Sequence, residues 1–395
     1  MERRTFIKSS VLASTSLMVP NFLKASSLNL NTAHDKNLVV IQLSGGNDGL
    51  NTIVPFRSDI YHQLRPKVSL KSTSTLPLND ELSINNNLPE FKKLYDEGHV
   101  SIINSVGYPN PNRSHFRSLD IWHSASSSDK YVDSGWLGRY LDNYGEGVAP
   151  VIEVDDSLSL ALKGNSRFGL AVSNPGKFYR SSKDPFFEAL GKSTNKAELG
   201  ISNLDYLYKT MIDTQSAASY INEKSKLWTN KTTFPSTAIG RKLKQTAQFI
   251  NARLSTKVYY LEHGGFDTHA GQLNTQSRLL NQFDASIAAF VQELKAGDSF
   301  DNTIIMIFSE FGRRVKENGS GGTDHGTANS VFIIGNKLKT AGMLNNYPSL
   351  DNLDANGDLI FSIDFRSVYA TILNRWMGVS DKLILGEKFK YLNFI

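Results

Sequence analysis

The amino-acid sequence predicts an α/β protein with a largely parallel sheet sandwiched by helices. Short apolar runs rich in Val and Ile recur along the chain and are typical of strands that are buried on both faces. Helical patterns lie between several of these runs, and this alternation favours a parallel sheet with helices on both sides. The expected strands are 38–43, 100–106, 151–154, 258–261, 303–308 and 331–334.

Apolar stripes at helical spacing predict the main helices. Three stripes each mark one buried helix face. The first ends at Gly98, the second and longest begins at Leu280, and the third ends at Gly378. Their members are Leu88, Phe91, Leu94 and Tyr95; Leu280, Phe283, Ile287, Phe290, Val291 and Leu294; and Phe365, Val368, Tyr369, Ile372 and Trp376.

Residues 155–240 differ from the rest, since they are rich in Ser, Lys and Asn and contain no strong strand pattern. A helical pattern is present only around 204–220. We therefore expect a single domain over 36–395, in which 155–240 form a cap or insertion rather than a separate domain.

The first 25 residues are expected to be a twin-arginine signal peptide. Paired arginines, an aromatic residue two positions later and a lysine resemble this receptor-read signal; they are Arg3-Arg4-Thr5-Phe6-Ile7-Lys8. A modest apolar stretch over 11–23 and the small residue Ala25 complete the pattern. We expect the twin-arginine translocase as a partner during export and a periplasmic or extracellular location. The alternative is an ordinary amphipathic first helix.

Composition excludes several classes of function. Of the net charge of +5, three charges belong to residues 1–25, and no basic stripe with interleaved aromatics indicates nucleic-acid binding. The absence of cysteine excludes disulfides, thiolate catalysis and cysteine-based zinc sites. We expect no stable membrane span, because no other run approaches the length of about 18–20 apolar residues that one needs. Small or polar molecules are the expected partners.

The motif Gly-Gly-x-Asp occurs three times, whereas composition alone predicts on the order of 0.1 copies. Its copies are Gly45-Gly46-Asn47-Asp48, Gly264-Gly265-Phe266-Asp267 and Gly321-Gly322-Thr323-Asp324. The first two follow expected strands directly, so they place carboxylates at the carboxyl edge of the sheet, where α/β proteins bind ligands. The alternative is three tight turns in which each Asp bonds to its own backbone.

Histidines accompany two of these motifs. His263 and His269 flank Asp267, and His325 follows Asp324. Neutral imidazole with carboxylate is a ligand set for zinc, manganese or iron. In an extended segment, Asp267 and His269 point to the same side, because they are two positions apart.

Two further clusters are candidates for the chemistry. Glu310 and Arg313 follow the strand 303–308. Glu310 is a candidate metal ligand, or the ion-pair partner of a neighbouring arginine. Arg313 is a candidate to bind an anionic substrate through its guanidinium group. Ser114 begins an expected helix. It is a candidate nucleophile, with Arg113, Arg117 and the helix N-terminus stabilising a bound oxyanion, or simply the N-cap of that helix.

The order of these clusters resembles the alkaline phosphatase and sulfatase superfamily, and more closely an exported family of unknown function within it whose members begin with twin-arginine signals. The resemblance implies an alkaline phosphatase-like core and a divalent metal: zinc, manganese, calcium or magnesium. It implies one metal ion on Asp267, His269 and His325 and a second on Asp48, Glu310 and Ser114. The motifs that carry it lie at 42–52, 112–116, 263–269, 309–314, 322–327 and 364–367.

Two departures from the superfamily pattern bear on the metals. Asp267 and His269 are closer together than is usual there, which leaves His263 as a rival ligand. Phe311 stands where a histidine is expected, so the second site lacks an imidazole and suits a hard ion such as magnesium or calcium better than zinc. Asp324 is a candidate to compensate.

Three functions follow as hypotheses. The first is an exported, metal-dependent hydrolase of small anionic phosphate or sulfate esters, with Ser114 as the nucleophile. The second, supported by Phe311, is a non-catalytic exported protein of the same fold that keeps at most a structural metal and acts in binding or assembly. The third is a metal-free serine hydrolase, against which no Gly-x-Ser-x-Gly elbow surrounds Ser114.

Overall fold

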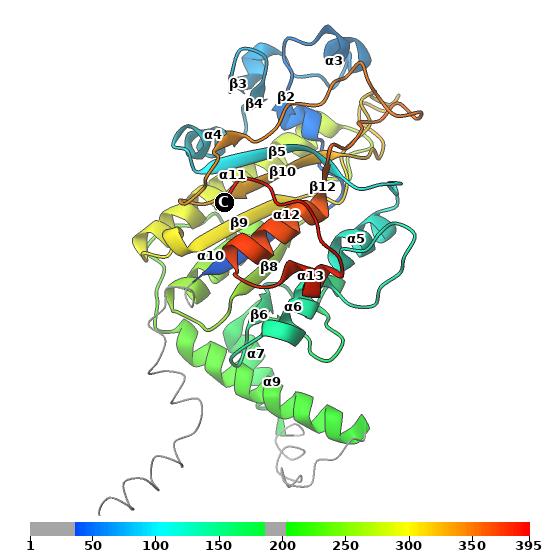
Figure 1. Cartoon of the computed structure of the whole chain (residues 1–395). Helices are drawn as coiled ribbons and strands as arrows, with labels where there is room; N and C mark the ends of the chain where they lie inside the picture. The colour runs from blue at the N-terminus through cyan, green and yellow to red at the C-terminus, as the bar shows by residue number, and fades with distance from the viewer. Residues whose placement is uncertain (1–35, 186–202) are drawn as a thin grey trace, which may run out of the picture. The chain divides into compact units, whose positions relative to one another are not determined.

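A mostly parallel sheet organises the fold (Figure 1). The computed structural model describes residues 36–185 and 203–395, and in this part nine strands pair in the order β11-β5-β10-β9-β1-β8-β6-β7, with β12 also on β5. They are β1 (Asn37–Leu43), β5 (Val100–Gly107), β6 (Val151–Glu153), β7 (Leu170–Ala171), β8 (Val258–His263), β9 (Thr303–Phe308), β10 (Asn329–Ile334), β11 (Gly342–Met343) and β12 (Ile363–Asp364). A smaller antiparallel sheet consists of β2 (Ile53–Val54), β4 (Ser83–Asn85) and β3 (Thr75–Pro77).

Helices cover both faces of the large sheet, which confirms the predicted fold class. The described helices are α3 (Asp59–Leu64), α4 (Pro89–Asp96), α5 (His115–Ser124), α6 (Trp136–Tyr144), α7 (Pro175–Ser182), α9 (Asn203–Ser225), α10 (Ala238–Asn251), α11 (Gln272–Ala296), α12 (Phe365–Thr371), which continues as a π-helical turn (Ile372–Trp376), and α13 (Asp381–Leu385). Of these, α3 packs in a separate apolar cluster beside the small sheet.

The alternation of side chains along β1 divides the apolar interior into two cores. Val39 and Ile41 pack with α4, α10 and α11, whereas Leu38 and Val40 pack with α5, α6, α12 and α13. Successive residues of a strand point to opposite faces, so a central strand that is covered on both faces is apolar throughout. This explains why residues 38–41 of β1 form an unbroken apolar run.

The register of three parallel strands places their carboxyl ends side by side. Leu43 at the end of β1 lies opposite His263 of β8, and Gln42 lies opposite Phe308 of β9. The segments that leave these strands at 44, 264 and 309 therefore emerge at one edge of the sheet. This is the edge at which the sequence predicted a ligand site.

β10 is antiparallel to both of its neighbours, β9 and β5. Parallel strands need a long crossover, but residues 309–328 return from β9 to β10 without a helix. Instead, this segment pairs with itself, since Arg313 bridges to His325 and Gly312 accepts a hydrogen bond from the backbone of Gly326. The sheet is thus largely, not wholly, parallel.

The segment 155–240 adds β7 to the sheet edge next to β6, and its helices α7 and α9 pack against each other. Whether it acts as a cap or insertion stays a prediction. The expected signal peptide, residues 1–25, lies outside the described residues. In the part of the chain that the structure describes, no helix is long and apolar enough to cross a membrane.

A buried polar network ties α5 to the centre of the sheet. His123 Nε2 lies 3.0 Å from both Gln42 Oε1 and the Tyr260 hydroxyl, which itself donates to Gln42. Burial lowers the pKa of His123 to about 4. The imidazole is therefore neutral in the folded protein at any pH above this value.

This network predicts a specific loss of stability in acid. Because the unfolded imidazole takes up a proton below a pKa of about 6.5 and the folded one does not, stability falls as the pH drops below that value. Between pH 7.5 and pH 5 we expect His123 to contribute a loss of about 2 kcal/mol in the free energy of unfolding. Denaturant titrations of the wild type and of His123→Gln at both pH values measure this difference. Equal losses in the two proteins would contradict it.

Candidate metal centre

The three Gly-Gly-x-Asp motifs meet at the guanidinium of Arg313, whose side chain is fully buried. Nε donates to Gly46 O, at 2.6 Å, and Nη1 donates to Thr323 O, at 2.8 Å. Nη2 donates to Asp267 Oδ1, at 2.8 Å, to Phe266 O, at 3.0 Å, and to Gly45 O. Each motif thus supplies at least one acceptor. A buried arginine is tolerated when its donors are satisfied in this way. Arg313 therefore holds the motifs together, and each of its three side-chain nitrogens is bound to an acceptor of the protein.

Glycine is required where the first two motifs touch. Gly45 has a φ of +112°, and a Cβ on it would lie 2.8 Å from the carbonyl carbon of Phe266. Gly46 has a φ of +73°, and a Cβ on it would collide with the ring of Phe311. Both positions favour glycine because of their backbone angles and because other chain segments approach them closely.

Three histidines converge on one oxygen of Asp267. Asp267 Oδ1 lies 3.0 Å from His269 Nε2, 3.1 Å from His325 Nε2 and 3.5 Å from His115 Nε2. The Nε2 atoms of His269 and His325 are 2.9 Å apart. The expectation that Asp267 and His269 point to the same side is thus met by their geometry. Asp267 and His269 are almost half exposed, so the cluster is open to solvent on one side.

The second nitrogen of each ring is bound to an acceptor. His115 Nδ1 lies 2.8 Å from Glu310 Oε1, His269 Nδ1 lies 3.0 Å from Asp324 Oδ1, and His325 Nδ1 lies 2.7 Å from the carbonyl oxygen of Arg113. Because carboxylates and carbonyls only accept, each Nδ1 carries a proton, and a ring in its neutral form presents a lone pair at Nε2. Such outer partners are usual around metal-binding histidines.

The cluster fits a metal ion by three observations. His115 Nε2 is buried and has no hydrogen-bond partner among the described residues. The Nε2 atoms of His269 and His325 face each other at 2.9 Å, and between neutral rings a cation or a shared proton would stabilise this arrangement. Two ligand atoms that each lie 2.0–2.2 Å from one ion are at most about 4.4 Å apart. The three separations between Asp267 Oδ1 and the histidine Nε2 atoms, and the separation between His269 Nε2 and His325 Nε2, are all shorter than this. Candidate ligand atoms of His115, Asp267 and His325 lie within 4.8 Å of one another.

The charges of the cluster also suit a cation. Burial raises the pKa of Asp267, but the contacts of this carboxylate with Arg313 and His325 outweigh the effect of burial and hold the pKa at about 2. Burial lowers the pKa of His325, which favours the neutral imidazole. Asn318 and then His269 donate to Asp324 and lower its pKa. The carboxylates are therefore ionised at neutral pH and can neutralise a divalent ion.

Asp48 and Glu310, the carboxylates expected for a second metal, are engaged elsewhere. Asp48 forms a fully buried ion pair with Arg65, at 2.6 Å, and also accepts from Gln272. Glu310 accepts from His115 and from the backbone of Gly45.

Phe311 lies at the base of the cluster, where the resemblance places a histidine. Its ring centroid is 4.8 Å from that of His115 and 4.7 Å from that of His325. It supplies apolar contact instead of a ligand. Among the described residues, the candidate ligands therefore gather in a single cluster.

Of the two rival histidines, the structure brings His269 to the cluster. His263 is buried and its Nε2 lies 3.1 Å from the carbonyl oxygen of Leu279. His115 was missed by sequence reasoning, although it follows Ser114 directly. The available signal was its place just after a strand, at the start of a helix, where side chains reach the same edge as Asp267.

Ser114 occupies the N-cap position of α5, but its hydroxyl makes no capping hydrogen bond, and the residue is exposed. It stands in the chain between Arg113, whose carbonyl holds His325, and His115. Its hydroxyl is therefore available for chemistry.

The arginines expected to bind an anion contact the protein itself. Arg113 pairs with Asp358, and Arg117 donates to the carbonyl oxygens of Ser128 and Lys130 and stacks on Tyr131. Arg313, described above, is fully engaged as well.

Comparison with solved structures finds similar folds at low identity. A sulfatase, PsFucS1 from Pseudoalteromonas sp., is 14% identical, with a TM-score of 0.40, over 94% of this chain and 72% of that chain. A protein in the alkaline phosphatase superfamily from Vibrio parahaemolyticus is 11% identical, with a TM-score of 0.40, over 90% and 70%. The lipoteichoic acid synthase LtaP from Listeria monocytogenes is 9% identical, with a TM-score of 0.38, over 80% and 69%. Similarity at this level does not determine activity.

No curated protein matches the chain. A family model described as "Protein of unknown function (DUF1501)" matches residues 104–386. This range holds every member of the histidine cluster and most of the large sheet. The chain belongs to the DUF1501 family.

Proposed function

We propose that this protein binds one divalent metal ion at His115, Asp267, His269 and His325 and hydrolyses phosphate or sulfate esters there. One observation carries the proposal: the Nε2 atoms of three histidine rings, each held by an acceptor at Nδ1, converge on the ionised Asp267. Three imidazoles and a carboxylate suit zinc or manganese, and the single ligand cluster among the described residues favours a single ion.

A metal bound there would lower the pKa of a hydroxyl group or water and stabilise negative charge on the group being transferred. The protein contributes the rest. Ser114 presents a free hydroxyl beside His115, and the first-turn amides of α5 offer donors to an anion. Glu310 keeps His115 in the required tautomer. Since the three candidate arginines are engaged, the ester's charge is met by the metal and by this helix terminus.

A second candidate function is a non-catalytic protein that keeps the metal for structure, acting in binding or assembly. The full engagement of Arg313 and Arg117 with the protein favours it, because ester hydrolases use free cations to hold their anionic substrates. Both candidate functions include the metal site, but only the first predicts that the protein hydrolyses esters.

The metal site predicts its own stoichiometry. Elemental analysis of the purified full chain should give about one divalent ion per molecule. His325→Ala should reduce the ion content at least tenfold, since it removes a ligand that touches Asp267 and His269. His99→Ala, a control on a histidine that packs on Phe300, should keep it. Two ions per chain, none, or an unchanged content in His325→Ala would refute the single site.

The nucleophile predicts a separation of binding from turnover. Ser114→Ala should lower kcat at least a hundredfold on aryl phosphates or aryl sulfates, with the metal content unchanged, because the hydroxyl is not needed to hold the ion. Ser349→Ala, an exposed serine outside the site, is the matched control. Full activity in Ser114→Ala would exclude this nucleophile, and a metal-loaded wild type without turnover would favour the non-catalytic function.

Export by the twin-arginine translocase to the periplasm or the extracellular space is part of the proposal and rests on residues 1–25. Replacing Arg3 and Arg4 by lysine should leave the protein in the cytoplasm, because the translocase reads the arginine pair. Lys8→Arg, which keeps the pair, should export normally. Immunoblots of cell fractions measure both, and export of the double variant at the normal level would argue against this pathway.

A further inference from the structure

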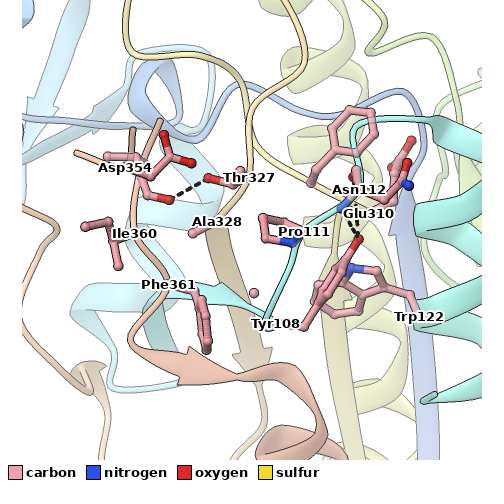
Figure 2. A pocket seen from close by; sticks show the side chains of 13 residues that line it. Tyr108, Pro111, Asn112, Trp122, Glu310, Thr327, Ala328, Asp354, Ile360 and Phe361 are labelled. Carbon is pink, nitrogen blue, oxygen red and sulfur yellow. Dashed lines mark hydrogen bonds between the residues drawn. The ribbon is translucent and has the colours of Figure 1, made fainter. Parts of the chain in front are cut away.

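The two outer carboxylates of the histidine cluster are anchored differently. Glu310, which holds His115, is fully buried in the wall of a cavity of about 160 Å³ (Figure 2), and the backbone of Gly45 donates to it at 2.9 Å. Asp324, which holds His269, is 52% exposed. Because water competes for an exposed carboxylate, Asp324 needs a further contact to stay on His269.

Asn318 supplies this contact. Its Nδ2 donates to Asp324 Oδ1, at 3.1 Å, and this is the oxygen that lies 3.0 Å from His269 Nδ1. The same Nδ2 donates to the backbone carbonyl oxygen of His269, at 2.9 Å. Among the described residues, Asn318 and His269 are the only side chains that donate to this carboxylate. One amide group thus contacts His269 at its backbone and, through Asp324, at its ring.

The oxygen of the Asn318 amide is held by the turn that carries it. Asn318 Oδ1 accepts from the backbone N–H groups of Ser320, at 2.9 Å, and Gly322, at 3.2 Å. Because N–H groups only donate, whereas carboxylates and carbonyls only accept, these partners determine which side of the amide is the nitrogen. The four hydrogen bonds together hold the Asn318 side chain in a single orientation.

The turn itself packs on the segment that carries His269. The backbone N–H of Thr323 donates to the carbonyl oxygen of Thr268, and a Cβ on Gly322 would lie 2.5 Å from the same oxygen. Glycine allows the two backbones to come this close. The third Gly-Gly-x-Asp motif therefore packs against the chain of a candidate ligand, and its Asp holds the ring of that ligand from outside.

We propose that Asn318 is a positioning residue of the metal centre, which holds Asp324 on His269. In this way it keeps His269 Nε2 turned toward Asp267 and His325. The inference rests on the proposed function for the metal that it serves, but the orientation of His269 is a property of the protein without metal. Mutation of such outer partners lowers metal affinity about 10–100-fold.

Asn318→Asp tests the proposal, because it replaces the Nδ2 donor by a carboxylate oxygen and keeps the acceptor for Ser320 and Gly322. The dissociation constant of the full chain for Zn²⁺, measured by competition with a chromogenic chelator, should rise at least about tenfold. Asn352→Asp makes the same change at an exposed asparagine of another loop and should bind Zn²⁺ as the wild type does. An unchanged dissociation constant in Asn318→Asp would overturn the proposal.

A double-mutant cycle separates this role from a general loss of structure. In an Asp324→Asn background, the side chain at 324 still accepts from His269 Nδ1 through its amide oxygen, but the carboxylate introduced at 318 no longer faces a like charge. Asn318→Asp should therefore weaken Zn²⁺ binding by at most about threefold in this background. An equal loss in both backgrounds would show that Asn318 does not act through Asp324, and the proposal would be wrong.

The orientation of His269 is also measurable without metal. In the metal-free wild type at pH 8, ¹⁵N NMR of the histidine rings should show His269 protonated at Nδ1, whereas Asn318→Asp should show a population with the proton on Nε2. Protonation at Nδ1 alone in both proteins would contradict the proposal. If the wild type bound no Zn²⁺ but the tautomers changed as expected, the positioning role would stand and the proposed function would fail. Zn²⁺ binding and turnover that Asn318→Asp leaves unchanged would refute the positioning role alone.

Discussion

The buried guanidinium of Arg313 is the interaction on which the site depends. It is the point at which three segments distant in the sequence, around Gly45, Asp267 and Thr323, share one hydrogen-bonding group. Each segment leaves a different part of the sheet and none could hold its loop conformation by local contacts alone. Because a buried charge must have its acceptors in place, the three loops form together or not at all. The positions of Asp267 and the neighbouring His325, which lies opposite Arg313, follow from it.

The orientation of the histidines depends on a second layer of contacts. Glu310, Asp324 and the carbonyl of Arg113 each hold one ring by its Nδ1. The loop between β9 and β10 contributes to this layer as well as to the inner one, since it carries both Glu310 and His325. Its hairpin-like pairing, which makes β10 antiparallel, thus serves the site. A helix between these strands would have carried the intervening residues away from the edge.

Much of the fold and three of the four residues of the histidine cluster could be predicted from the sequence, for identifiable reasons. The apolar runs within β1 and β9 are uniform in hydrophobicity, and Asp267 and His269 are close in sequence, so periodicity and spacing predict their placement. His115 could not be assigned, because its contact with Asp267 depends on how α5 docks. The partners of Asp48 and Arg113 were hidden for the same reason: whether a charged side chain is free or paired depends on residues such as Arg65 and Asp358.

The central position of β1 limits how this protein can be divided. The stretch matched by the family, 104–386, contains β8 and β9 but not β1, which lies between them and pairs with both. A fragment cut at those bounds would expose two strand edges in the middle of the sheet and strip Arg313 of its acceptors on Gly45 and Gly46. The matched stretch is therefore not an autonomous folding unit, and expression, crystallisation or domain-fusion experiments need the chain from Asn37 onward.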